Sequence, residues 1–226
     1  MAKPNLIILT GPQGSGNHMF SKIFAVHKDV YGWNELLKQD WIGHKHEPFH
    51  KFWLNPELLS QENWVPEHEY YITSISCPYQ YNGVMCLPKY YDFTEKAKEI
   101  FDIQFVIIGR DANILKCQEE RVRGSVTYYT MSDLVESIIE LKYPVHFVST
   151  ELVYLYNKDY LRNLSHQLKF PIAYAHKQIW EILHTDPNKK YIKYVEEGAY
   201  DEETRRASGT NFCGVRPLTK NEAIQE

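Results

Sequence analysis

The chain has 226 residues, of which 43% are hydrophobic and 24% charged, a composition typical of a soluble globular protein. This length predicts one domain, or one domain with insertions, that can bury a substantial core. The formal net charge of −4 argues against a general nucleic-acid surface, although a local basic groove is compatible with it. No apolar run is long enough to span a bilayer, so we expect no membrane partner.

The cysteines and the N-terminal sequence predict a cytoplasmic protein. The four cysteines form no C-x-x-C pair, which favours reduced thiols over a disulfide framework or a zinc knuckle. The first four residues lead directly into an apolar segment and lack a signal-peptide pattern. The cysteines are Cys77, Cys86, Cys117 and Cys213.

A glycine-rich segment follows the first apolar run of the chain. Residues 6–10 indicate a buried parallel strand, and residues 17–27 indicate a helix with one apolar face. Between them lie three glycines in six residues, with the spacing G-x-x-x-x-G from Gly11 to Gly16. Such a loop brings backbone amides and the positive end of a helix dipole to an anion, so we expect phosphate-type binding rather than a plain turn. The expected binding residues are Gly11, Gly14, Ser15, Gly16, Asn17 and His18.

Two positions after the loop depart from its ATP-binding form. Asn17 stands where a lysine is expected, and His18 stands where a magnesium-binding serine or threonine is expected. This argues against the usual Mg-ATP chemistry, and we expect no metal. His18 opens the helix, where it either contacts the transferred group or the acceptor as a catalytic residue, or packs and caps the helix.

An irregular insert extends from about residue 30 to residue 66 and is rich in Trp, His and Pro. We expect it to form short helices over the edge of the sheet. Its densest group of titratable side chains includes His44 and His46, which would share a face if extended. One of these two, or Glu47, is a candidate general base. A metal site and a structural or surface role are the alternatives, and the metal site lacks a cysteine or a further acidic residue at ligand spacing.

The remaining sequence alternates predicted strands with predicted helices. Strands are expected at residues 70–74, 104–109 and 145–148, and a loop at residues 77–83. Helices are expected at residues 92–101, 111–122 with Asp111 as N-cap, 131–142 capped by Thr130 or Ser132, 152–168 and 173–183. This order predicts an α/β three-layer sandwich of the P-loop type with a mostly parallel central sheet. We expect one domain over residues 1–197 and a polar C-terminal tail over residues 198–226, which is either a surface loop or partly disordered.

Polar residues that follow the predicted strands converge on one edge of the sheet, where α/β proteins bind ligands. Arg110 offers a phosphate a planar fork of donors, or forms a salt bridge with Asp111 or Glu151. Gln118 lies two helical turns further on and either donates to the same phosphate or is a solvated helix residue.

Two further groups have alternative roles. Arg121 and Arg123 belong either to a mobile basic loop that supplies the positive charge missing from the glycine loop, or to an exposed helix end. Aromatic residues of the insert and the later loop form an acceptor or adenine pocket, or complete a core. These aromatic residues are Trp33, Trp41, Trp53, Tyr79 and Tyr81.

Four segments, in the same order, resemble motifs of the sulfotransferase branch of the P-loop fold. Gly14-Ser-Gly-Asn-His18 resembles the family's 5′-phosphosulfate loop, and Ser74-Ile-Ser-Cys-Pro78 resembles its strand end Lys-x-His-x-Pro. Val106-Ile-Ile-Gly-Arg-Asp-Ala-Asn-Ile-Leu115 resembles the segment that binds the donor's 3′-phosphate. Val148-Ser-Thr-Glu-Leu152 resembles the family's Tyr-Glu-Asp-Leu segment. The resemblance covers roughly residues 5–175.

The resemblance implies metal-free transfer of a sulfuryl group from 3′-phosphoadenosine 5′-phosphosulfate, a small nucleotide donor, to a hydroxyl or amine. Arg110 would anchor the 3′-phosphate, and Gln118 stands where the family has a serine. The family's catalytic His and its neighbouring Lys correspond to Ser76 and Ser74, so a histidine of the insert would have to serve as the base.

Two other functions stay open. A divergent P-loop nucleotide or polynucleotide kinase needs Arg121, Arg123 or Lys22 to replace the missing lysine. A non-catalytic nucleotide-binding protein is consistent with the replaced Lys, His and Ser positions. No motif encodes the acceptor or the oligomeric state.

Overall fold

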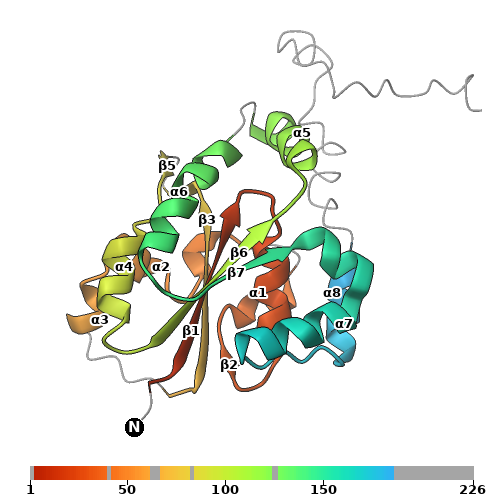
Figure 1. Ribbon diagram of the computed structural model, residues 1–226, viewed down its shortest axis with the longest axis horizontal. Helices are drawn as coiled ribbons and strands as arrows, with labels where there is room; N and C mark the ends of the chain where they lie inside the picture. The colour runs from red at the N-terminus through yellow and green to blue at the C-terminus, as the bar shows by residue number, and fades with distance from the viewer. Residues whose placement is uncertain (1–2, 40–41, 62–66, 82–83, 124–126, 186–226) are drawn as a thin grey trace, which may run out of the picture.

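A five-stranded parallel sheet forms the centre of the molecule (Figure 1). Its order is β2–β3–β1–β6–β7, and every neighbouring pair is parallel. The strands are β1 (Asn5–Pro12), β2 (Val30–Tyr31), β3 (Tyr70–Cys77), β6 (Asp102–Gly109) and β7 (Val145–Ser149). The computed structural model describes residues 3–39, 42–61, 67–81, 84–123 and 127–185.

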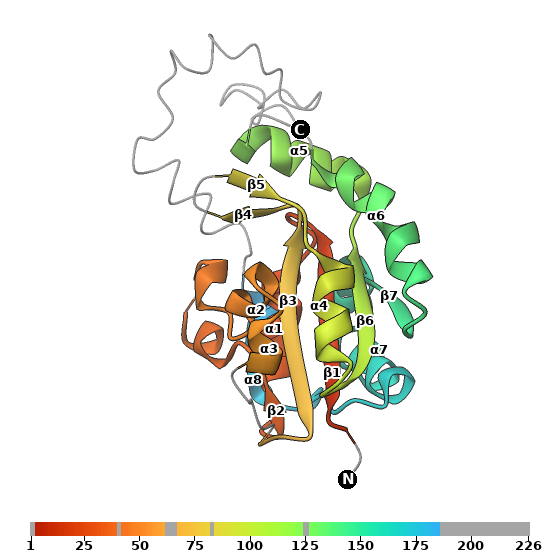
Figure 2. The same cartoon turned by 90° about the vertical axis from the view of Figure 1, so that its left-hand side faces the viewer.

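Helices cover both faces of the sheet, which makes a three-layer α/β sandwich (Figure 2). One face is covered by α1 (Asn17–Ala25), α7 (Thr150–Leu168) and α8 (Lys177–His184). The other is covered by α2 (His50–Leu54), α3 (Leu58–Gln61), α4 (Tyr90–Ala97) and α6 (Tyr128–Glu140). The predicted α/β fold with a mostly parallel central sheet is therefore confirmed.

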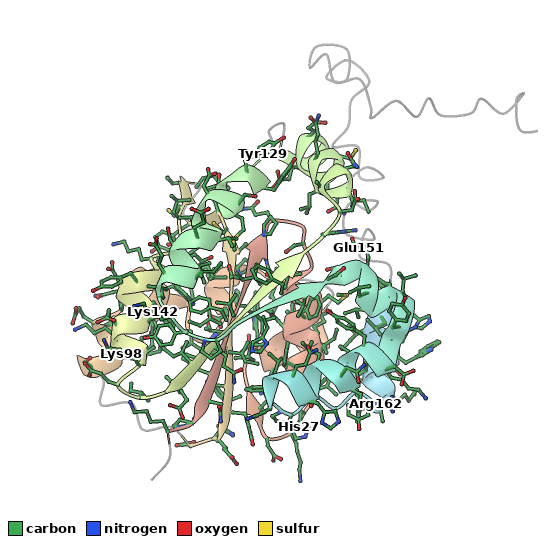
Figure 3. All side chains as sticks on the ribbon, viewed as in Figure 1. His27, Lys98, Tyr129, Lys142, Glu151 and Arg162 are labelled. Atoms are coloured by element: carbon green, nitrogen blue, oxygen red, sulfur yellow. The ribbon has the colours of Figure 1, made fainter. Side chains whose placement is uncertain are left out.

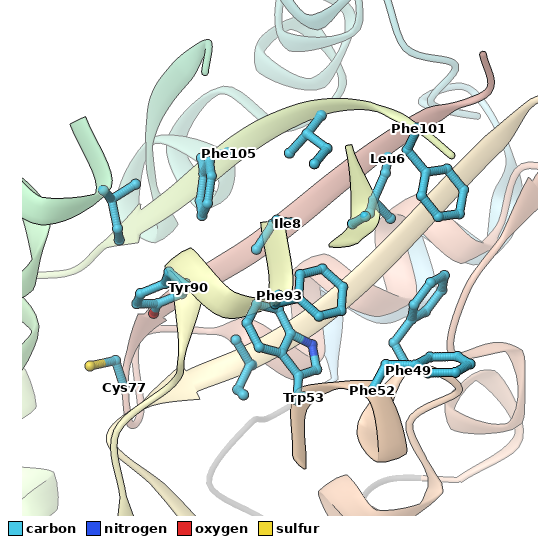
Figure 4. Packing of buried hydrophobic residues seen from close by; sticks show 14 of the residues in the cluster. Leu6, Ile8, Phe49, Phe52, Trp53, Cys77, Tyr90, Phe93, Phe101 and Phe105 are labelled. Carbon is cyan, nitrogen blue, oxygen red and sulfur yellow. The ribbon is translucent and has the colours of Figure 1, made fainter. Parts of the chain in front are cut away.

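Strand β1 is apolar along most of its length because both of its faces are covered. Leu6 and Ile8 belong to the core on one face, and Ile7 and Leu9 to the core on the other. Successive strand residues point to opposite faces, so a strand between two helical layers needs a continuous apolar run. Figure 4 shows the first of these cores, where Trp53 of α2 stacks on Phe93 of α4 with ring centroids 4.0 Å apart.

The insert forms short elements, as its sequence predicts, but α2 and α3 cover a face of the sheet rather than its edge. The two residues of β2 pair with the first two residues of β3. The 3₁₀ helices η1 (Asn34–Lys38) and η2 (His44–His46) follow β2, and α2 and α3 come after them. Beyond its pairing with β2, strand β3 is also held by the insert, since the amide of Ser74 donates to a carboxylate oxygen of Glu47.

Several predicted boundaries are wrong. Helix α4 ends at Ala97 rather than at residue 101, and α8 begins at Lys177 rather than at residue 173. Residues 77–83, expected as a loop, include β4 (Tyr79–Tyr81), which pairs antiparallel with β5 (Val84–Cys86). The helix expected from residue 131 begins at Tyr128 as α6, without a side-chain cap from Thr130 or Ser132. Its start is set by the buried carboxylate of Glu119 on α5 (Ala112–Arg123), which accepts hydrogen bonds from the amide and hydroxyl of Thr127.

The N-cap prediction is confirmed at α5, where Asp111 Oδ1 accepts from the amides of Asn113 and Ile114. The expectation of reduced thiols is met at Cys77 and Cys86. It is wrong at Cys117, which is disulfide-bonded. Residues 198–226 and the predicted domain end at residue 197 also lie outside the described part of the chain.

Candidate functional site

The glycine loop lies at the carboxyl ends of the parallel strands, between β1 and α1. Strand β1 is also the switch point of the sheet, since β3 lies on one side of it and β6 on the other. The chain leaves β1 toward the layer of α1, whereas after β6 it passes through α5 to α6 in the opposite layer. Connections that diverge in this way open a crevice in which α/β proteins bind ligands.

The geometry of the loop requires its three glycines. Gly14 and Gly16 have φ values of +88° and +114°, a region that other residues rarely adopt. A Cβ on Gly11 would lie 2.6 Å from the carbonyl oxygen of Ile108 on the adjacent strand β6. Gly16 precedes α1 and provides no side-chain cap, so the amides of the first turn can donate to an anion.

Arg110 follows β6 and contacts both the glycine loop and α5. Its Nη1 donates to the carbonyl oxygen of Gly14 at 2.8 Å and to Oε1 of Gln118 at 3.1 Å. Its Nε lies 3.9 Å from Oε1 of Glu151, at the start of α7 (Figure 3). Arg110 and Gln118 are therefore beside the loop as predicted, and the alternative salt bridge to Glu151 is also present.

Several buried polar atoms at or beside the loop have no hydrogen-bond partner among the described residues. They are Ser15 Oγ, Asn17 Oδ1, Ser74 Oγ and Arg110 Nε. An unpaired buried polar group costs about 1–3 kcal/mol, and native proteins contain few of them. Their concentration in one place indicates that a bound ligand or water supplies the missing partners.

Asn17 connects the loop to β3. Its Nδ2 donates to the carbonyl oxygen of Gly11 at 3.3 Å and to Oγ of Ser76 at 2.9 Å. Gly11 and Ser76 are register partners on β1 and β3, so the Asn17 amide bridges the ends of two neighbouring strands. The nitrogen of this amide thus serves the loop's structure, while Oδ1 is available to a ligand.

Three rings pack together beside the loop. His18 of α1 contacts Trp33 and His44 of the insert with centroid separations of 5.0 and 5.1 Å, and Trp33 and His44 lie 5.3 Å apart. Nε2 of His18 lies 3.0 Å from the carbonyl oxygen of Ile42, which requires the proton on that nitrogen. Nε2 of His44 lies 3.5 Å from Oγ of Ser76. His18 and His44 therefore meet at the strand end that holds Ser76.

The other two candidate bases of the insert have different surroundings. His46 is exposed and, within the described ranges, makes no hydrogen bond or ring contact with this ring cluster. Glu47 is buried and accepts from the amides of Phe49 at 2.9 Å and Ser74 at 3.3 Å. Burial raises the pKa of Glu47 to about 8, although hydrogen bonds from these amides and from Thr73 act to lower it. At pH 7 this carboxyl keeps its proton, so it is not a base there.

The remaining predicted residues do not join the described site. Arg121 and Arg123 lie in the last turn of α5, and their side chains are outside the described residues, as is Trp41. Trp53 and Tyr79 are buried in the core that Figure 4 shows, and Tyr81 is exposed on the β4–β5 hairpin.

Two residues of the site were missed by the sequence reasoning. Thr150 Oγ1 donates to the carbonyl oxygen of Ser15, and a Cβ on Gly16 would lie 2.8 Å from that hydroxyl. Gln13 Nε2 donates to the carbonyl oxygen of Pro78 at 2.8 Å. No local pattern encodes these contacts, although the position of Thr150 directly after a strand is the signal that identified Arg110.

The sequence matches no protein-family model and no curated protein. A function must therefore be argued from the site itself. In residues 3–39, 42–61, 67–81, 84–123 and 127–185, no group of three or more His, Cys, Asp or Glu side chains is arranged to hold a metal ion. No helix within these ranges has both the length and the apolar character needed to cross a membrane.

Proposed function

We propose that the protein binds 3′-phosphoadenosine 5′-phosphosulfate and transfers its sulfuryl group to a hydroxyl or amine of a small acceptor. The observation that carries this proposal is the position of Arg110, whose guanidinium contacts the loop at Gly14 while its buried Nε has no hydrogen-bond partner in the described part of the chain. The loop would hold the 5′-phosphosulfate, and Arg110 with Gln118 would hold the 3′-phosphate.

The site residues fit an in-line displacement at sulfur. Amides of the loop and the first turn of α1 would stabilise the charge that develops on the leaving 5′-phosphate. His44 would take the proton of the acceptor, because its imidazole lies at the strand end beside the loop. His18 would position His44 through their ring contact and the hydrogen bond to Ile42.

The kinase alternative needs a cation to replace the lysine of the loop. Lys22 is directed elsewhere, because its Nζ donates to the carbonyl oxygen of Gln39 at 2.7 Å. The non-catalytic alternative differs from our proposal only in turnover, so it predicts donor binding without transfer over a broad acceptor screen. We keep the cytoplasmic location as part of the proposal, and imaging of the tagged full chain tests it.

Calorimetry with adenosine 3′,5′-bisphosphate, the product of the donor, tests the proposal. We expect the wild-type chain to bind this compound and Arg110→Ala to weaken binding about 50- to 100-fold, because charge-assisted hydrogen bonds to the 3′-phosphate are lost. Arg110→Lys should lie between the two, since it keeps the charge but loses the planar fork.

Arg162→Ala is the matched control. Arg162 lies in the second half of α7, where it pairs with Asp159 at 2.9 Å, and Figure 3 shows it away from Glu151 at the start of that helix. The Arg162→Ala variant should bind adenosine 3′,5′-bisphosphate with the same affinity as the wild type. Binding of Mg-ATP in place of the bisphosphate would favour the kinase, and binding of neither would remove the nucleotide from the proposal.

A further inference from the structure

Ser76 is in direct contact with both the loop and the imidazole of His44. It lies near the end of β3 as the register partner of Gly11, and its side chain is buried. Its Oγ accepts a hydrogen bond from Asn17 Nδ2 at 2.9 Å and lies 3.5 Å from His44 Nε2.

The hydrogen bonds of Asn17 define the role of each atom of the Ser76 hydroxyl. The contact of Asn17 Nδ2 with the carbonyl oxygen of Gly11 fixes the amide nitrogen on the side that faces Ser76. Asn17 therefore occupies one lone pair of Ser76 Oγ, and the hydroxyl can donate its proton to His44 Nε2 in the tautomer that leaves this nitrogen unprotonated. A hydroxyl beside an imidazole whose ring is held in place by its neighbours is the arrangement that activates a serine nucleophile, and such contacts are often longer before ligand binds. Here the rings of His18 and Trp33 pack against His44.

The other hydroxyls described at the site do not face a base. Thr150 Oγ1 donates its proton to the carbonyl oxygen of Ser15. The Oγ atoms of Ser15 and Ser74 are buried with no hydrogen-bond partner among the described residues, so no base is in place to take their protons. Ser76 is thus the hydroxyl of the loop region that the structure pairs with a base.

We propose that Ser76 is an internal acceptor for the group carried by the bound donor. This inference rests on the proposed function, because the donor is the nucleotide held by the glycine loop. Ser76 Oγ forms a bond to the sulfur of the sulfuryl group, and the bond from that sulfur to the bridging phosphate oxygen breaks. The electron pair leaves with adenosine 3′,5′-bisphosphate, and the hydroxyl proton passes to His44 Nε2. The product is a serine O-sulfate at position 76.

The test needs no knowledge of the external acceptor. The full chain is incubated with 3′-phosphoadenosine 5′-phosphosulfate carrying radioactive sulfur, and labelled peptides are located by mass spectrometry under conditions that preserve sulfate esters. We expect one label on the peptide that contains Ser76, none on Ser76→Ala, and at least a tenfold slower reaction in His44→Gln.

His46→Gln is the matched control, because His46 lies on the same short helix but is exposed and outside the ring cluster. The His46→Gln variant should incorporate the radioactive sulfate at the wild-type rate. Peptide mapping of the wild type locates the label even if Ser76→Ala fails to fold. Absence of label at Ser76 in a chain that binds adenosine 3′,5′-bisphosphate by calorimetry would overturn this inference alone. Labelling of Ser76 at equal rates in wild type and His44→Gln would overturn the role of His44.

Discussion

Wild-type protein should lose about 3 to 4 kcal/mol of unfolding free energy between pH 5 and pH 8 through the single carboxyl of Glu47. Burial raises the folded-state pKa of this group from 4.5 to about 8. Between those two values the folded chain holds the proton and the unfolded chain has released it, so raising the pH favours unfolding. Below pH 4.5 both states are protonated, and above pH 8 both are ionised, so the contribution is confined to this window.

Urea unfolding of wild type and Glu47→Gln at pH 5, 6, 7 and 8 measures this effect. The amide of glutamine stays neutral, so the variant should lack the part of the slope that comes from Glu47. Glu99→Gln removes a carboxyl from an exposed position and should keep the wild-type slope. Parallel stability curves for wild type and Glu47→Gln would contradict the burial of this carboxyl.

Gly11→Ala should destabilise the protein by about 3 kcal/mol and abolish binding at the loop. The new Cβ would lie 2.6 Å from two oxygens, the backbone carbonyl of Ile108 and the hydroxyl of Ser15. The hydroxyl can move, but the carbonyl belongs to the central strand β6, which pairs with β1 along its length. Strands β1 and β6 must separate locally, and this separation displaces the glycine loop that follows β1.

Gly109→Ala is the control for this substitution. Gly109 also ends a central strand beside the site, but the nearest atom to its new Cβ would be the carbonyl oxygen of Val148 at 3.6 Å, an ordinary contact. Thermal unfolding should show a melting temperature about 6–12 °C lower for Gly11→Ala and nearly unchanged for Gly109→Ala. Similar melting temperatures for the two variants would show that the loop is not pressed against β6.

The sequence predicted those parts of the fold that depend on neighbours in the chain. The apolar run of β1, the cap at Asp111 and the glycine spacing are short-range patterns, and each is found where it was expected. The topology of parallel strands then placed Arg110 beside the loop, because the carboxyl ends of such strands meet at one edge.

The sequence could not predict elements whose ends are fixed by distant residues. Helix α6 begins at Tyr128 because the buried carboxylate of Glu119 accepts hydrogen bonds from Thr127. A pattern search favours the nearest local cap instead, which gave a start three residues too late. The β4–β5 hairpin was missed for a related reason, since its three-residue strands are too short to show a periodic pattern.

The sequence by itself determined that an α/β chain presents a glycine loop and an arginine at one sheet edge. Only the tertiary structure distinguished His44 from His46, which are equivalent in a local pattern and two residues apart. Packing of the insert against α1 places the His44 ring against His18 and beside Ser76, and it leaves His46 exposed. Local patterns report which residues share a face. The pairing of Ser76 with an imidazole 32 residues earlier depends on how two separate segments close over the same strand end.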